Sequence, residues 1–239
     1  MCTIVTTAPI TVAFITLIMY HRTMENHLTP PKTPLINLEN YIFTHSVSPT
    51  RAALMMSSVV GVHIGIKPAA AEDFSSEEMQ DIDLGDFIEL LKPLGLRAIF
   101  YHRTYPQGNK LDWFQDIYIS RSLDTASNLR QEFETLWNSM DDFGQIIDEP
   151  KWQSATRKIG SLLGYPETAV EQFAATTAPN IDDPDRAARM KRHRYYVHTA
   201  EHEEQEFESY DLKLNQAIAE LAPRTAAELT KNPHKRWLK

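Results

Sequence analysis

Residues 159–173 form the stretch I-G-S-L-L-G-Y-P-E-T-A-V-E-Q-F, which decides the fold of the second half of the chain. Apolar side chains recur at helical spacing on both sides of Gly164. A glycine just past the last apolar position typically ends a helix, and a proline suits the first turn of the next one. We therefore predict two helices that meet at a tight corner and bury Leu163, Val170 and Phe173.

Helical periodicity also appears in other parts of the chain. A helix over 52–66 is rich in small residues, so we expect it to pack closely on its neighbours. Further helices are predicted over 84–91, from a cap at Ser122 or Asp124 to a terminal glycine at Gly144, and over 199–221. The last of these has a buried stripe made of Phe207, Tyr210, Leu214, Ile218 and Leu221. For residues 35–45 the pattern is compatible with a helix or a strand.

A β-hairpin is predicted in the first half. Residues 96–103 and 117–121 have the composition of strands, and the loop over 104–115 contains proline, glycine and asparagine. Ala98 and Phe100 fall on one face and Ile99 and Tyr101 on the other, so both faces of the sheet should be covered.

We therefore predict an α+β fold that is mostly helical, with a small antiparallel β element early and a helical C-terminal half. Residues 35–225 form the expected domain. Residues 1–34 hold an apolar segment and a proline-rich linker, and residues 226–239 form a basic tail.

The segment over residues 4–20 is uncharged and apolar, and as a helix it would be marginal for crossing a bilayer. A pair of strands and a translation start at Met24 remain equally open. We expect a soluble cytoplasmic protein, with a membrane anchor through residues 4–20 as the alternative.

The composition excludes several classes of partner and site. The chain of 239 residues has 42% apolar residues and a formal net charge of -8, which gives no overall attraction to nucleic acid. Its one cysteine is Cys2, which excludes an internal disulfide and a zinc or iron–sulfur site held by cysteines. No glycine-rich phosphate loop or catalytic serine motif is present, so the sequence identifies no reaction or other cofactor.

The run L-G-Y-P-E-T-A-V-E-Q-F at 163–173 resembles the L-G-Y-P-x-C-C-V-x-x-F signature of a prokaryotic family of domains of unknown function. The resemblance also includes G-I-K-P-A at 65–69. In the family a histidine with further cysteines and an acidic helix follows; His198 and the glutamate-rich run after it could match, but no cysteine lies near His198. Thr168 and Ala169 occupy the two cysteine positions, so a role of those thiols cannot be transferred to this chain.

Basic residues concentrated within an acidic chain suggest a site for an anionic small ligand bearing phosphate or carboxylate. The candidate ligand-binding residues are Lys67, Arg97, His102, Arg103, Arg192 and Arg194. The alternative is that the basic cluster over 186–194 is a solvated face paired with the acidic residues downstream. Whether the ligand would be a substrate stays open.

Two other functions are compatible with the sequence. The corner within residues 152–175 has the spacing of a helix-turn-helix, so a nucleic-acid or protein interaction module is possible, although Glu167 and Glu171 would oppose phosphates. The second alternative function is a divalent-metal site, because His198, His202 and Glu206 lie four residues apart and could share one helix face.

Overall fold

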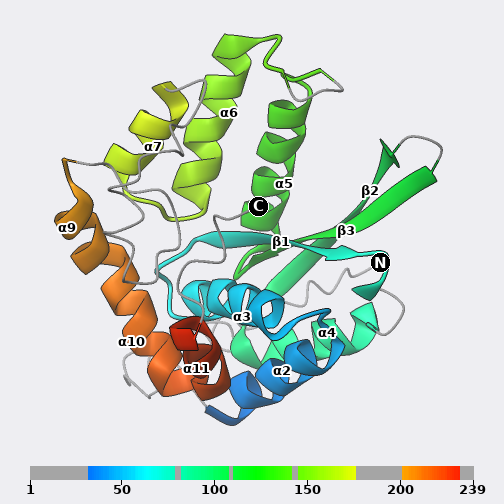
Figure 1. The fold of residues 1–239 in the computed structure, drawn as a ribbon, viewed down its shortest axis with the longest axis vertical. Coiled ribbons are helices and arrows are strands. Elements are labelled where there is room, and N and C mark those ends of the chain that lie inside the picture. The colour runs from blue at the N-terminus through cyan, green and yellow to red at the C-terminus, as the bar shows by residue number, and fades with distance from the viewer. Residues whose placement is uncertain (1–31, 79–81, 108–109, 142–144, 176–200, 232–239) are drawn as a thin grey trace, which may run out of the picture. The chain divides into compact units, whose positions relative to one another are not determined.

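The computed structural model describes residues 32–78, 82–107, 110–141, 145–175 and 201–231. The described residues from Thr33 onward belong to one compact unit. Helices lie on both sides of a three-stranded antiparallel sheet (Figure 1). The predicted fold class, α+β and mostly helical, is confirmed.

The sheet has the order β1-β3-β2, with both pairs antiparallel. Its strands are β1 (Ala69–Ser75), β2 (Arg97–Gln107) and β3 (Lys110–Ser120). The hairpin was predicted, but a long loop over 104–115 is wrong, because β2 and β3 pair as far as Gln107 opposite Lys110. Pairing between backbones continues the ladder through residues whose side chains do not follow a strand pattern.

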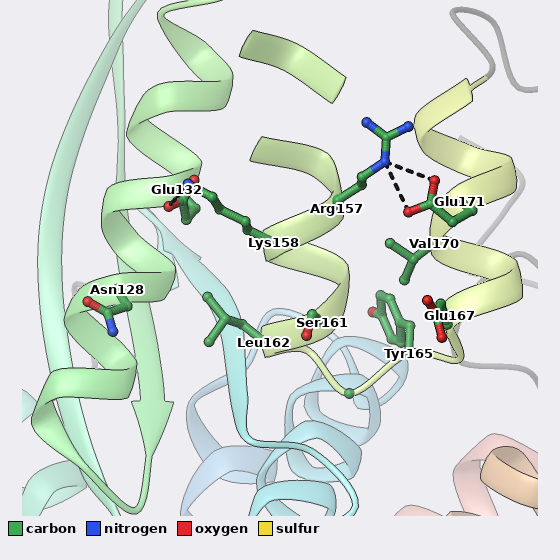
Figure 2. A pocket seen from close by; sticks show the side chains of 11 residues that line it. Asn128, Glu132, Arg157, Lys158, Ser161, Leu162, Tyr165, Glu167, Val170 and Glu171 are labelled. Atoms are coloured by element: carbon green, nitrogen blue, oxygen red, sulfur yellow. Dashed lines mark hydrogen bonds and ion pairs between the residues drawn. The ribbon is translucent and has the colours of Figure 1, made fainter. Parts of the chain in front are cut away.

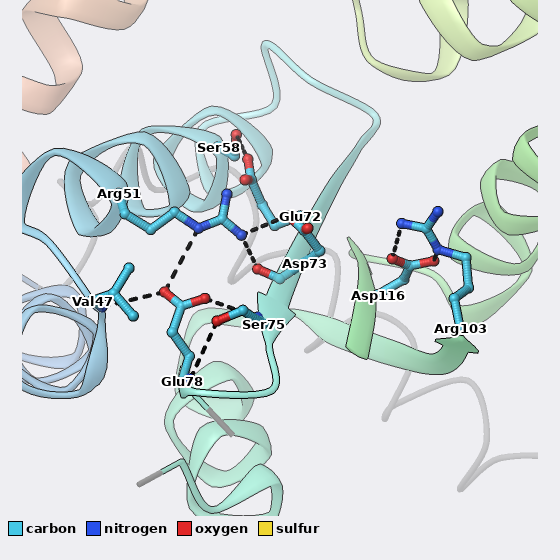
Figure 3. Close-up of polar contacts among 9 residues, drawn as sticks. All are labelled: Val47, Arg51, Ser58, Glu72, Asp73, Ser75, Glu78, Arg103 and Asp116. Carbon is cyan, nitrogen blue, oxygen red and sulfur yellow. Dashed lines mark hydrogen bonds and ion pairs between the residues drawn. The ribbon is translucent and has the colours of Figure 1, made fainter. Parts of the chain in front are cut away.

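Strand β1 was missed because A-A-A-E-D-F-S lacks the β-branched residues that are typical of strands. It is an edge strand, and side chains bond to its backbone (Figure 3). Arg51 donates to the carbonyl oxygen of Asp73, and the N–H of Ser75 donates to Glu78 Oε2 at 2.9 Å. These contacts occupy backbone groups that an edge strand otherwise offers to another chain.

Both faces of the sheet are covered, as predicted. Ala98 and Phe100 pack against the larger hydrophobic cluster, whereas Ile99 and Tyr101 pack against a smaller one on the other face. In Figure 1 the sheet separates α5, α6 and α7 from the group formed by α2, α3, α4, α10 and α11.

The larger cluster is built around α2 (Lys32–His45) and α3 (Pro49–His63). The undecided segment over 35–45 is therefore helical, and it buries Leu35, Leu38 and Ile42 at helical spacing. Ser48 caps α3 by accepting the N–H of Arg51 at 3.2 Å. Almost every residue of α3 from Ala52 onward is buried, which explains its small side chains.

Short helices connect this layer to the sheet. Helix α4 (Leu84–Leu91) begins at Asp83, whose Oδ1 accepts the N–H groups of Gly85 and Asp86. The 3-10 turn η2 (Lys92–Leu94) follows it and ends at a glycine in the left-handed conformation.

The C-terminal helices complete the larger cluster. A continuous helical run contains α9 (Glu203–Glu206), the π-helix η3 (Phe207–Asp211) and α10 (Leu212–Leu221). The predicted stripe is buried along the whole run, at Phe207, Tyr210, Leu214, Ile218 and Leu221.

Helix α11 (Pro223–Lys231) contains residues 226–231, which the sequence analysis assigned to a basic tail. Its first turn is held by the buried carboxylate of Glu39, which accepts the N–H of Thr225 at 2.7 Å. A negative charge is favourable there because the N-terminus of a helix carries a partial positive charge. This partner lies far away in the sequence, so the local pattern does not reveal the helix.

Helices α5 (Leu123–Trp137), α6 (Glu149–Leu162) and α7 (Glu167–Ala175) form the other layer. The chain turns after Trp137, so α5 ends earlier than predicted, and Gly144 lies outside the described residues. The prediction that Phe173 is buried is wrong. Its side chain is 39% exposed, although its ring lies 6.1 Å from that of Trp152.

The corner between α6 and α7 forms as predicted. The N–H of Gly164 bonds to Ser161 O and the N–H of Tyr165 to Gly160 O, each at 3.0 Å. This pair of bonds is a Schellman motif, which requires a left-handed residue, and Gly164 has φ +74. Val170 is buried against Gly160, where a Cβ atom would lie 2.6 Å from Val170 Cγ2.

The corner also touches the loop between α3 and β1. A Cβ atom on Gly164 would lie 2.5 Å from the carbonyl oxygen of Ile66 and 3.1 Å from Cα of Lys67. Two backbones therefore meet at this point without an intervening side chain. The contact joins the layer that contains α6 to the layer that contains α3.

We predict that Gly164→Ala destabilises the protein more than Gly95→Ala. Both glycines are left-handed, so each substitution should cost about 1–2 kcal/mol in strain. Only Gly164 has neighbouring atoms within 4 Å of the added Cβ atom, and the nearest belongs to a backbone. The clash should cost about 1–3 kcal/mol more. Urea denaturation of the two variants checks this, and equal losses would contradict the contact.

The stability should also depend on His63 at the end of α3. Burial lowers the pKa of His63 from its ordinary value of 6.5, while its Nδ1 lies 3.2 Å from the carbonyl oxygen of Leu94. The unfolded chain therefore takes up a proton as the pH falls below 6.5, before the folded chain does, and this favours unfolding. We expect urea to unfold the wild type more easily at pH 5 than at pH 7.5. His63→Gln should reduce that difference.

Candidate functional site

The structure brings together two of the sequence runs on which the family resemblance rests, 65–69 and 163–173. The loop of residues 65–69 lies against the corner at Gly164 and Tyr165. Lys67, a predicted anion ligand, extends from this loop along Gly61, where a Cβ atom would lie 3.0 Å from its Cγ and Cδ. The lysine is thus held between α3 and the corner.

Lys67 does not reach open solvent, because it is only 2% exposed. Its Nζ lies 3.5 Å from Ser58 Oγ, which in turn donates to Glu72 Oε1 at 2.5 Å. The same ammonium lies 5.8 Å from the ring centroid of Tyr165. A charge buried in this way needs polar and aromatic neighbours to offset its lost hydration. In this conformation Lys67 supports the corner and is not a surface ligand.

Tyr165 also contacts the π-helix. Its ring lies 6.0 Å from that of Tyr210 at 67°, and Tyr210 is almost fully buried. Nearby, Thr168 at the start of α7 donates a hydrogen bond to the buried carboxylate of Glu206. A π-helical turn is uncommon and frequently occurs at functional sites. Through Tyr210, the π-helix packs against the ring of Tyr165.

The other predicted anion ligands in the described residues do not converge. Arg97 and Arg103 lie on one face of β2, six positions apart, which corresponds to about 20 Å along a strand. His102 lies on the opposite face and is exposed. Arg192 and Arg194 are outside the described residues. These residues do not form a common site within the part of the chain that the structure describes.

Arg103 has a structural role. Its guanidinium pairs with the buried carboxylate of Asp116, with Nη2 2.6 Å from Oδ1 (Figure 3). The same guanidinium stacks 4.2 Å above the ring of Trp137. Burial raises the pKa of Asp116, and the contact with Arg103 opposes that rise. Burial and the nearby carboxylate also raise the pKa of Tyr118. These three groups form one polar cluster beneath α5.

The predicted metal ligands are only partly described. His198 lies outside the described residues, His202 precedes α9, and Glu206 is engaged by Thr168. Within the described ranges, no group of three or more His, Cys, Asp or Glu side chains could hold a metal ion. The arrangement of Glu206 has another explanation, which is its contact with α7.

A groove runs between α5, α6 and α7, with a volume of about 820 Å³ (Figure 2). We call it the α5–α7 groove. The residues that line it include Asn128, Arg157, Lys158, Ser161, Tyr165 and Glu167. Tyr165 and Gly164 place its lower end at the corner, directly against the loop that holds Lys67.

Ion pairs join the helices that form the groove. Lys158 Nζ lies 2.9 Å from Glu132 Oε1 and connects α6 to α5. Arg157 Nε lies 3.0 Å from Oε1 and 2.9 Å from Oε2 of Glu171 and connects α6 to α7. Among the described residues, the terminal nitrogens Nη1 and Nη2 of Arg157 have no hydrogen-bond partner. In Figure 2 they point away from Glu171.

Three residues of the groove were not predicted from the sequence, namely Arg157, Lys158 and Ser161. They lie on the polar side of α6, which has the same pattern as an ordinary solvated helix face. The weak signal available was a basic pair two turns before a predicted corner. Only the packing of α5 and α7 on either side makes that face the floor of a groove.

The corner gives no support to a site for nucleic acid. Glu167, Glu171 and Gln172 are exposed on α7, and two of them are negatively charged. Glu171 is paired with Arg157, and α7 has no basic residue, so this helix offers no positive charge to a nucleic-acid backbone.

Comparison with family models, curated proteins and solved structures found no match. Where the chain is described, none of the helices is long and apolar enough to cross a bilayer. The apolar segment over 4–20 lies outside those residues.

We predict that Arg103→Ala destabilises the protein by about 3 kcal/mol at pH 7, because it leaves the carboxylate of Asp116 buried without its partner. The loss should shrink at acidic pH, where protonation removes that uncompensated charge. Arg97→Ala, an exposed arginine on the same strand, is the control and should cost less than about 0.5 kcal/mol. Equal effects in urea denaturation would contradict the structural role.

Proposed function

We propose that this protein binds a small molecule with a phosphate or carboxylate group in the α5–α7 groove. The observation that supports this most directly is the guanidinium of Arg157. Glu171 holds its Nε, while Nη1 and Nη2 have no hydrogen-bond partner among the described residues. A guanidinium edge presents parallel N–H groups that match the oxygens of an anion.

The size and lining of the groove fit a small ligand. Pockets for small molecules commonly have volumes of about 300–1,000 Å³ and combine apolar walls with a few polar groups. The value of about 820 Å³ falls in this range, and Leu162 and Val170 contribute the apolar surface. Asn128 and Ser161 add groups that can donate or accept hydrogen bonds.

The ion pairs in the groove help to position the anion site. Glu171 orients the guanidinium of Arg157, which reduces the side-chain freedom that a ligand would have to restrict. The carboxylates of Glu132 and Glu171 are both neutralised by a paired cation. Glu167 is different, because among the described residues its carboxylate has no ion-pair partner. Its charge should weaken the binding of an anion.

We predict that Arg157→Ala weakens binding of an anionic ligand about tenfold or more, because it removes charged hydrogen bonds. Lys151→Ala is the matched control, since Lys151 is an exposed cation on the same helix outside the groove. A thermal-shift screen of phosphorylated and carboxylated metabolites finds the ligand, and calorimetric titration then compares the variants.

In the same experiment, Glu167→Gln should change the affinity for the anion in the opposite direction. Removing its negative charge should strengthen anion binding, by up to about fivefold. The proposal would be abandoned if no anion stabilised the wild type, or if Lys151→Ala weakened binding as much as Arg157→Ala. The stability of Arg157→Ala should change by less than about 1 kcal/mol, because the lost ion pair is partly exposed.

A further inference from the structure

The aromatic ring of Tyr165 lines the α5–α7 groove and is packed against buried side chains. The ring stands at the lower end of the groove, between α6 and α7 (Figure 2). The Schellman motif at Gly164 fixes the backbone that carries it. The side chain is only partly exposed, so it presents part of its surface to the groove.

Two buried side chains hold this ring. The ammonium of Lys67 lies 5.8 Å from its centroid, and the ring of Tyr210 lies 6.0 Å away at 67°. Lys67 and Tyr210 are 2% and 4% exposed, so neither can move aside without disturbing the core. A ring held in this way loses little freedom when a ligand packs against it.

The spacing between the ring and the anion site adds a second constraint. Arg157 lies five residues before Leu162, the last residue of α6, which is about 7.5 Å along the helix axis, and Tyr165 follows the turn beyond that end. Ser161 lies one turn after Arg157 on the same side of α6 and also lines the groove. A ligand that reaches both ends must therefore be extended, with a polar middle section.

We propose that the ligand is a planar aromatic ring joined by a polar linker to an anionic group, as in a mononucleotide. The ring packs against Tyr165, the linker lies along Ser161, and the anion binds Arg157. Packing between aromatic rings contributes about 0.5–1.5 kcal/mol, which corresponds to roughly 2- to 12-fold in affinity. This inference rests on the proposed function, since it describes the ligand of the same groove.

Three probes separate the two ends of the ligand. Adenosine monophosphate has both the ring and the anion, ribose 5-phosphate lacks the ring, and adenosine lacks the anion. In calorimetric titrations of the full chain, adenosine monophosphate should bind about 2- to 12-fold more tightly than ribose 5-phosphate. It should bind about tenfold or more tightly than adenosine, because the charged hydrogen bonds to Arg157 are retained.

Variants then assign each end to its residue. Tyr165→Leu should remove the advantage of adenosine monophosphate over ribose 5-phosphate, whereas Tyr165→Phe should keep it, because the ring remains. Arg157→Ala should bring adenosine monophosphate close to adenosine. The comparison of probes on the wild type does not depend on whether Tyr165→Leu folds.

The outcomes distinguish the two proposals. If ribose 5-phosphate binds as tightly as adenosine monophosphate, and Tyr165→Leu changes neither, the aromatic ligand is wrong and anion binding stands. If adenosine binds as tightly as adenosine monophosphate, the anion site at Arg157 is wrong. If none of the three probes binds, the mononucleotide class is wrong, and the wider anion screen decides the proposed function.

Discussion

The close contact of two backbones at Gly164 and Ile66 is the constraint on which the rest of the structure depends. A Cβ atom on Gly164 would lie 2.5 Å from the carbonyl oxygen of Ile66, so only glycine permits this approach. The contact joins the α6–α7 corner to the loop before β1, and it places Tyr165 beside Lys67. Because Tyr165 lines the α5–α7 groove, the geometry of the groove follows from the same contact.

Most basic side chains that the structure describes near the sheet stabilise the fold. Arg103 neutralises Asp116 beneath α5, and Arg51 bonds to Asp73 at the edge of β1. Lys67 is enclosed between α3 and the corner. Because basic residues have such structural roles, their concentration in the sequence is a weak indicator of a ligand site. Burial and pairing distinguish the structural cations from Arg157, whose Nη1 and Nη2 have no partner among the described residues.

Sequence periodicity predicted elements whose stability depends on local capping and on one buried face. The corner at Gly164 and the stripe from Phe207 to Leu221 are examples. Predictions failed where a distant partner supplies the stability. Strand β1 has an unremarkable composition and exists because β3 pairs with it, and α11 is capped by Glu39. The loop over 104–115 was wrong because backbone pairing extends the hairpin to Gln107 and Lys110.

The sequence by itself determined the fold class, the alternation of β2 between two hydrophobic clusters and the sharp turn at Gly164. These features follow from spacing, glycine conformation and the burial of apolar side chains, which are properties of neighbouring residues. Only the tertiary structure decided which charges are enclosed and which face a cavity. Lys67 and Arg157 are both basic residues beside glycine-containing runs, yet one is buried and the other lines a groove. The environment of a charge is created by elements that are distant in sequence, and no local pattern contains that information.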